Sequence, residues 1–125
     1  MTAKILIVED EPHIVEAVRF LFQREGWHCA EETDGAKAVE AVSISDPDLI
    51  ILDQMLPNLS GIDIVKALRQ IDSSKRVPIL MLTAKGQARD RQMAELAGVT
   101  SFMTKPFANG ALVDEARRLL DGKTP

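Results

Sequence analysis

The sequence predicts an α/β protein in which a five-stranded parallel sheet carries helices on both faces, a (βα)5 arrangement. Five short apolar runs alternate along the chain with five segments whose apolar residues recur at helical spacing. The runs at residues 5–8, 49–52 and 79–82 contain no polar residue, which is typical of parallel strands buried on both faces. With 125 residues and 46% hydrophobic content, the chain has the size of one ordinary domain, which we expect to cover residues 1–125.

Each expected strand is an apolar stretch that a polar or turn-forming residue ends. The five stretches are residues 5–8, 27–32, 49–53, 79–82 and 99–103. The stretch 27–32 mixes charged with apolar residues, so we place this strand near an edge of the sheet. In open parallel sheets the carboxyl ends of the strands share one edge, where ligands gather.

Each expected helix follows from its apolar spacing and from residues that begin or end helices. Pro12 suits the first turn of the first helix, and Gly26 can take the left-handed conformation that ends it. Asp34-Gly35 opens the second helix, the segment 46–48 breaks it, and Ser60 is expected to cap the third. We therefore expect three helices before residue 72, where a polar turn follows.

The last two helices are predicted from patterns of different strength. Residues 85–97 predict a mostly polar helix that Gly98 ends. We expect its inner side to consist of Met93, Ala94, Leu96 and Ala97. Asn109 is expected to cap the final helix, which has a strong apolar side at residues 112–120.

The charge of the chain indicates partners other than nucleic acids. Its net charge of -4 and sequence pI near 5.1 do not suit direct nucleic-acid binding, since such domains usually carry a basic face. We therefore expect proteins or small ions as partners. The apolar run after Lys4 is too short for a signal peptide or a membrane span, which predicts a cytoplasmic protein that does not enter a membrane.

Five polar side chains follow predicted strands directly, so they should meet at one edge of the sheet. They are Glu9, Asp10, Asp53, Thr83 and Lys105. Each has an ordinary explanation as a turn residue, a helix cap or a solvated surface group. These ordinary explanations do not account for the group as a whole, because neighbouring carboxylates repel one another unless cations are supplied. Lys105 supplies one positive charge, and the hard oxygen ligands, without a Cys/His set, predict Mg²⁺ rather than zinc.

A magnesium site beside a carboxylate at a strand end suits phosphoryl transfer. Magnesium often binds one or two carboxylates together with phosphate oxygens. Asp53 would be the nucleophile and form an acyl phosphate, with Mg²⁺, Lys105 and the Thr83 hydroxyl at the phosphoryl oxygens. These residues therefore predict a phosphorylatable aspartate.

These residues resemble those of a known family, the receiver domains of two-component response regulators, and the resemblance covers essentially the whole chain. The matching motifs, in family order, are Glu9-Asp10, Asp53, Pro57 with Gly61, Thr83-Ala84 and Lys105-Pro106. The resemblance implies the flavodoxin-like strand order 2-1-3-4-5, for which a member of this family is a standard example. It also implies a cis peptide bond before Pro106, whose role would be structural.

The resemblance implies a role for each residue of the site. Mg²⁺ would be bound by Asp10, Asp53 and the backbone carbonyl of Met55, with Glu9 acting through a water molecule. Lys105 would pair with the phosphoryl group on Asp53.

The resemblance further implies a switch and a set of partners. Thr83 would move toward the phosphoryl group and Phe102 would turn inward behind it, which changes the surface of the last two strands and helices. Phe102 is equally well explained as an ordinary core residue of a short strand near the sheet edge. The implied phosphodonor is a histidine kinase or a histidine phosphotransfer protein, and the implied recipient of the signal is a downstream protein target or an output domain. Such a domain catalyses its own phosphorylation and dephosphorylation and is not a turnover enzyme.

Several positions depart from the family pattern or should modulate the chemistry. Residues 98–102 lack two acids that help to build a dimer face in transcription-factor receivers, so we expect a monomer or a weak dimer. Gln54 stands where an apolar residue is more usual, and the sequence offers no partner for its amide. Met55 and Lys85 flank the expected path of the attacking water, and we hypothesise that they tune the lifetime of the phosphoryl group.

Two alternatives fit parts of the sequence. A phosphohydrolase of the haloacid dehalogenase type would also use Asp53 as nucleophile with magnesium, but that family has Asp-x-Asp after its first strand, which this chain lacks. A flavodoxin-like binding module would need a Ser/Thr/Gly-rich phosphate loop after the first strand, and none is present. Whether an output domain follows residue 125 stays open, although the weak dimer pattern favours a stand-alone receiver.

Overall fold

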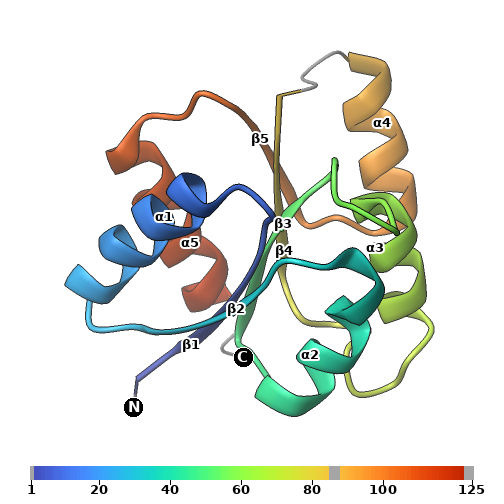
Figure 1. Ribbon diagram of the computed structural model, residues 1–125, viewed down its shortest axis with the longest axis horizontal. Helices are drawn as coiled ribbons and strands as arrows, with labels where there is room; N and C mark the ends of the chain where they lie inside the picture. The colour runs from blue at the N-terminus through green and yellow to red at the C-terminus, as the bar shows by residue number, and fades with distance from the viewer. Residues whose placement is uncertain (1, 85–87, 123–125) are drawn as a thin grey trace.

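A parallel sheet lies at the centre of the molecule, between two layers of helices (Figure 1). This computed structural model describes residues 2–84 and 88–122. The strands of the described part are β1 (Lys4–Val8), β2 (His28–Glu32), β3 (Leu49–Asp53), β4 (Ile79–Thr83) and β5 (Ser101–Thr104). They lie in the order β2-β1-β3-β4-β5 and each neighbouring pair is parallel, which confirms the predicted fold class and strand order.

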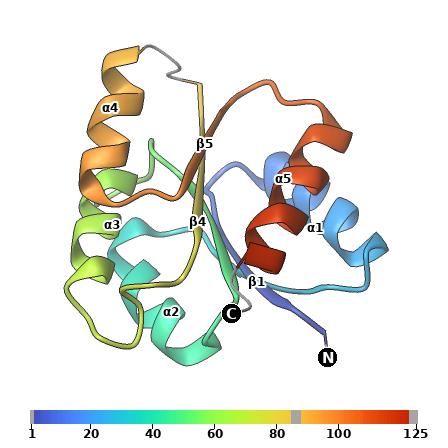
Figure 2. The same cartoon turned by 180° about the vertical axis from the view of Figure 1, so that it is seen from behind.

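Helices cover both faces of this sheet. In the described part they are α1 (Pro12–Arg24), a 3-10 turn η1 (Gly35–Lys37), α2 (Ala38–Ser45), α3 (Gly61–Arg69), α4 (Ala88–Ala97) and α5 (Asn109–Gly122). Helices α1 and α5 lie on one face, and α2, α3 and α4 lie on the other, as the two opposite views show (Figures 1 and 2). The predicted alternation of strands and helices is therefore confirmed.

The apolar runs are buried on both faces because successive side chains of a strand point to opposite sides. In β1, Leu6 and Val8 pack in the core under α2, α3 and α4, whereas Ile5 and Ile7 pack in the core under α1 and α5. Strands β3 and β4 are buried at every position. The two edge strands, β2 and β5, are only partly buried, as the charged residues of 27–32 predicted for β2.

A side-chain cap begins α3 and a left-handed residue follows the end of α4, both where the sequence predicted. The Ser60 Oγ accepts a hydrogen bond from Asp63 N at 3.3 Å in the first turn of α3. Gly98 has a φ of +112° just after α4, a conformation that residues with a Cβ rarely adopt. Asp34 accepts a hydrogen bond from Ala36 N at 2.9 Å, but it caps the 3-10 turn that precedes α2 and not α2 itself.

The prediction for the inner side of the fourth helix was wrong at two positions. Ala94 is buried and Ala97 half-buried, but Met93 and Leu96 are 49% and 88% exposed. The least exposed stripe of α4 combines the buried Ala94 with the half-buried Asp90 and Ala97, and it lies to one side of the predicted apolar pattern. Small side chains allow a helix to approach the sheet closely, so this stripe, and not the larger apolar residues, faces the core. Residues 85–87 of the predicted helix lie outside the described residues.

The start of the last strand also differs from the prediction. The Val99 N–H donates to the Ala94 carbonyl at 3.0 Å and so completes the end of α4. The strand therefore begins at Ser101 and not at residue 99, and it extends to Thr104.

Helix α5 begins one residue earlier than expected. Asn109 is its first residue, and the Leu112 N–H donates to the Ala108 carbonyl at 3.0 Å. Ala108 thus occupies the position that the sequence assigned to Asn109. None of the helices in the described ranges combines the length and the apolar character that crossing a membrane requires.

Candidate functional site

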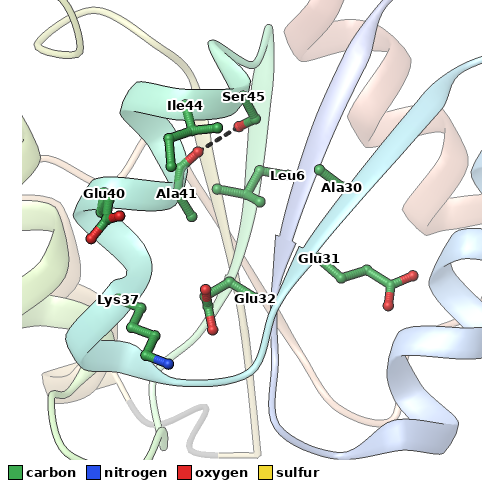
Figure 3. Close-up of a pocket in the computed structure, with 9 residues that line it drawn as sticks. All are labelled: Leu6, Ala30, Glu31, Glu32, Lys37, Glu40, Ala41, Ile44 and Ser45. Atoms are coloured by element: carbon green, nitrogen blue, oxygen red, sulfur yellow. Dashed lines mark hydrogen bonds between the residues drawn. The ribbon is translucent and has the colours of Figure 1, made fainter.

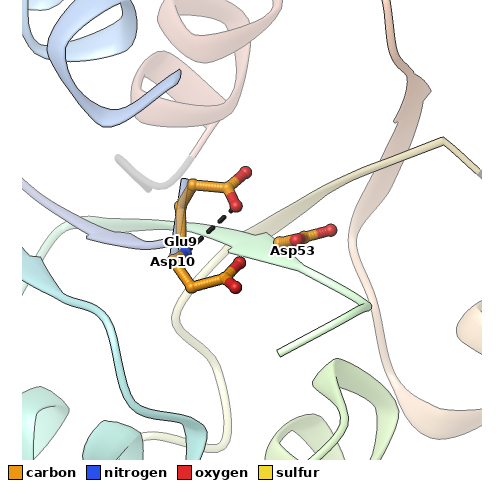
Figure 4. A group of neighbouring side chains, drawn as sticks. All are labelled: Glu9, Asp10 and Asp53. Atoms are coloured by element: carbon orange, nitrogen blue, oxygen red, sulfur yellow. Dashed lines mark hydrogen bonds between the residues drawn. The ribbon is translucent and has the colours of Figure 1, made fainter. Parts of the chain in front are cut away.

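Three carboxylates meet at the carboxyl edge of the sheet, as predicted. Glu9 and Asp10 follow β1 directly and Asp53 ends β3, the neighbouring strand. One carboxylate oxygen of each residue lies within 4.8 Å of the others (Figure 4). Glu9 and Asp53 are 3% and 4% exposed, whereas Asp10 is open to solvent. The group combines two buried acids with one that solvent reaches.

Lys105 inserts its ammonium group among these acids from the end of β5. Its Nζ lies 2.5 Å from Glu9 Oε1, 3.7 Å from Asp53 Oδ2 and 3.8 Å from Glu11 Oε1. The Lys105 N–H donates to the Thr83 carbonyl at 2.9 Å, which ties the residue to the end of β4. The peptide bond between Lys105 and Pro106 is cis, as the resemblance implies. Glu11 is a contact that the sequence did not predict.

Burial and charge shift the pKa values of the Lys105 and Glu9 pair. Burial raises the pKa of Glu9 to about 7; the hydrogen bond from Lys105 opposes this rise, and the charge of Asp53 adds to it. Burial alone would lower the pKa of Lys105, but its hydrogen bond to Glu9 and the charges of Asp53 and Glu9 outweigh that effect and raise it. Independently of these shifts, three carboxylates meet one ammonium group here, so the cluster has more acidic groups than Lys105 can neutralise and favours a further cation.

The Glu9 carboxylate is held in place by its own loop. Its Oε2 accepts hydrogen bonds from the backbone N–H groups of Asp10 at 3.1 Å and of Glu11 at 3.3 Å, while Oε1 faces Lys105. Figure 4 draws the bond from Asp10. Both oxygens of Glu9 are engaged, which suits an indirect role at a metal better than direct coordination.

The predicted switch residues lie on neighbouring strands. Thr83 is buried at the end of β4, one position beyond the residue that pairs with Asp53. Phe102 lies on β5 beside Met81 of β4 and is half-buried. The guanidinium carbon of Arg91, on α4, lies 5.2 Å from the centre of the Phe102 ring, a cation–π contact. Phe102 therefore bridges the core and the surface of α4.

The loop after Asp53 holds Met55, one of the two residues that were expected to flank the path of the attacking water. The Met55 N–H donates to Asp53 Oδ1 at 3.3 Å, and the Met55 side chain is 56% exposed. Lys85 lies outside the described residues. The structure also supplies the partner that the sequence did not offer for Gln54, since its Oε1 accepts a hydrogen bond from Ile62 N at 2.7 Å. A polar residue between a strand end and a Pro-x-x-x-Gly loop was the only signal of this contact.

A separate hollow lies between β2 and α2 (Figure 3). Leu6 and Ala30 contribute from the sheet, and Ala41 and Ile44 contribute from α2. Glu31 points away, to the other face of the sheet. None of the three clustered carboxylates lines this hollow, so it is separate from the acidic edge of the sheet.

Residues 5–117 match the family model of the response regulator receiver domain. The chain belongs to this family. Receiver domains are the phosphoacceptors of two-component signalling, and the match extends over nearly all of the sheet and helices described above. The haloacid dehalogenase alternative finds no support.

Relatives and solved structures agree with this assignment. The chain is 37% identical over 125 residues to the phosphate regulon transcriptional regulatory protein PhoB of Escherichia coli, and the match covers 100% of this chain and 55% of PhoB. The chemotaxis response regulator CheY4 of Vibrio cholerae has a TM-score of 0.90 at 31% identity, over 95% of this chain and 99% of that one. The receiver domain of sensor histidine kinase PA1611 from Pseudomonas aeruginosa was solved with a magnesium ion in its active site cleft. It has a TM-score of 0.88 at 29% identity, and the match covers 97% of this chain and 99% of that one. The chain spans about half the length of the curated relatives it matches.

Proposed function

We propose that Asp53 accepts a phosphoryl group from a phosphohistidine on a histidine kinase or a histidine phosphotransfer protein. The observation that carries this proposal is the meeting of Asp53 with Glu9, Asp10 and Lys105 at one edge of the sheet. Residues 1–125 act as a single receiver domain in this proposal. The exchange is expected in the cytoplasm, and the domain itself binds no nucleic acid.

The proposed cofactor is Mg²⁺, bound by Asp10, Asp53 and the Met55 backbone carbonyl, with Glu9 acting through water. The donor set fits, because all of these groups offer the hard oxygen atoms that magnesium prefers. The charge balance also fits, since Lys105 alone leaves the cluster negative. Magnesium bound in the related Pseudomonas receiver supports the same choice here. When bound, the ion supplies positive charge to the oxygens of the transferring phosphoryl group.

The residues of the chain perform the transfer by position and charge. An Asp53 carboxylate oxygen forms the new bond to phosphorus as the bond from phosphorus to the donor imidazole nitrogen breaks, and the imidazole leaves with the released electron pair. Lys105 Nζ lies 3.7 Å from Asp53 Oδ2, so it needs to shift only a short way from Glu9 to pair with a phosphoryl oxygen. The Thr83 hydroxyl is proposed to donate a hydrogen bond to another phosphoryl oxygen.

The proposed output follows from the strands that carry Thr83 and Phe102. Movement of Thr83 toward the phosphoryl group makes room for Phe102 to turn inward, which breaks its contact with Arg91 on α4. The altered surface on β4, β5, α4 and α5 then controls a downstream protein target or an output domain. The domain acts as a monomer or weak dimer, and as a signalling phosphoacceptor that is not a turnover enzyme.

The intact mass of the protein after incubation with acetyl phosphate tests the proposal. We expect the native chain to gain one phosphoryl group in the presence of Mg²⁺, and to gain none in the presence of a chelator. Asp53→Asn should gain none, whereas Asp72→Asn, which changes an acid whose side chain is 98% exposed, should behave as the native chain does. A phosphoryl group on Asp53→Asn, or one acquired equally without Mg²⁺, would contradict the proposal.

A further inference from the structure

Gln54, the residue after Asp53, holds the far end of the loop that follows β3. Its backbone carbonyl accepts a hydrogen bond from Gly61 N at 3.0 Å, and its side-chain Oε1 accepts one from Ile62 N at 2.7 Å. Both donors lie in the first turn of α3, where backbone N–H groups have no partner within the helix. Ser60, the N-cap residue, accepts a hydrogen bond from a different donor, the Asp63 N–H. Gln54 therefore acts as a second cap for α3, supplied from the end of a strand.

The contact between this strand end and α3 leaves no space for a side chain on Gly61. A Cβ atom there would lie 2.6 Å from the Asp53 carbonyl oxygen and 3.0 Å from Gln54 Oε1. On the other side of the same backbone, Met55 N donates to Asp53 Oδ1 at 3.3 Å. The peptide units around Gln54 are therefore held by α3 at one end and by the Asp53 carboxylate at the other.

We propose that Gln54 is a positioning residue for the magnesium site, because its two hydrogen bonds to α3 fix the backbone that carries the Met55 carbonyl. This inference rests on the proposed function, in which that carbonyl is a ligand. A carbonyl ligand has no side-chain rotamers, so only the hydrogen bonds and packing of its loop decide where it points. Groups that orient metal ligands commonly change metal affinity by about 10–100-fold when they are removed, and we expect about tenfold for this single acceptor.

Calorimetric titration with Mg²⁺ tests the role of Gln54 in two matched variants. Gln54→Met keeps an unbranched side chain of similar length and removes the strong acceptor. Ser60→Ala removes the other cap at the same end of α3 and leaves the link to the strand intact. Both variants should lower Tm, but only Gln54→Met should raise the Kd for Mg²⁺, by about tenfold. An unchanged Kd in Gln54→Met, or an equal rise in both variants, would overturn the inference.

Hydrogen exchange on the native chain tests the same coupling without any substitution. If the Gln54 contact strengthens magnesium binding, linkage requires magnesium to strengthen the contact by the same factor. Saturating Mg²⁺ should then slow exchange of the Ile62 N–H by about tenfold, and slow that of the Asp63 N–H, which Ser60 holds, less. Equal rates for Ile62 with and without Mg²⁺ would overturn the inference.

The two proposals fail in different ways. A native chain that binds no Mg²⁺ would remove the proposed metal site, and the role of Gln54 with it. A native chain that binds Mg²⁺, together with a folded Gln54→Met variant of equal affinity, would remove only the role of Gln54.

Discussion

Replacing Arg69 by methionine should lower the free energy of unfolding by about 2–5 kcal/mol, because its guanidinium joins three segments of the chain. Arg69 ends α3 and donates from Nε to the Gly98 carbonyl at 3.0 Å. Its Nη1 donates to the carbonyls of Ser74 at 3.1 Å and Val77 at 2.7 Å, and its Nη2 donates to Thr100 Oγ1 at 3.3 Å. Methionine retains much of the aliphatic chain and removes all of these donors.

The magnitude follows from the hydrogen bonds that Arg69 would no longer make. Val77 is only 8% exposed, so water does not readily replace the guanidinium at its carbonyl, whereas the Ser74 carbonyl keeps a 3.4 Å hydrogen bond from the Val77 N–H. Leaving the buried Val77 acceptor unsatisfied costs about 1–3 kcal/mol, and losing the bonds to the Ser74 and Gly98 carbonyls adds about 0.5–1.5 kcal/mol each, which gives about 2–6 kcal/mol in all. Burial also lowers the pKa of Arg69, so removing its partly desolvated charge recovers some free energy and brings the expected loss of stability to about 2–5 kcal/mol.

Urea unfolding followed by circular dichroism measures this change. Lys66→Met is the control, because it replaces another cation of α3 that is exposed, and we expect it to stay within about 0.5 kcal/mol of the native chain. Arg69→Lys should fall between the two, since one ammonium group cannot reproduce the planar set of guanidinium donors. A stability of Arg69→Met within about 0.5 kcal/mol of the native value would refute the reasoning.

Two further predictions concern pH and the lifetime of the phosphoryl group. Hydrogen bonds from Arg118, and also one from Ser101, lower the pKa of Glu115 from 4.5 to about 2. The folded carboxylate binds protons less readily than the unfolded one, so the stability that Glu115 contributes is present above pH 4.5 and is lost as the pH falls toward 2. The difference in unfolding free energy between the native chain and Glu115→Gln should therefore shrink over that range in urea titrations, and a constant difference would contradict the assignment. Met55→Ala should shorten the lifetime of the phosphorylated protein several-fold if, as hypothesised from the sequence, the Met55 side chain flanks the path of the attacking water; its backbone N–H already contacts Asp53 Oδ1. Phosphate release measures that lifetime, with Met93→Ala as a control of similar exposure, and an equal lifetime in Met55→Ala would exclude the role.

The sequence determined the elements of the fold and the edge at which the site lies, because both leave a local pattern. A strand buried on both faces needs an uninterrupted apolar run, and residues 5–8, 49–52 and 79–82 each have this pattern. The meeting of Glu9, Asp10 and Asp53 then followed from a rule of topology, since the carboxyl ends of parallel strands share one edge. The order of the strands did not follow from the alternation, which is the same for every doubly wound sheet; the family resemblance supplied it.

Only the tertiary structure decided which groups are partners. The resemblance assigned Lys105 to the phosphoryl group on Asp53, yet of the three carboxylates around its ammonium group Glu9 is the nearest. The partner of Gln54 is a backbone N–H beyond the following loop, and Leu96 points to solvent although its spacing placed it inside. These outcomes depend on how closely segments distant in the chain approach one another. That separation is set by the packing of the whole core, and no local pattern of residues records it.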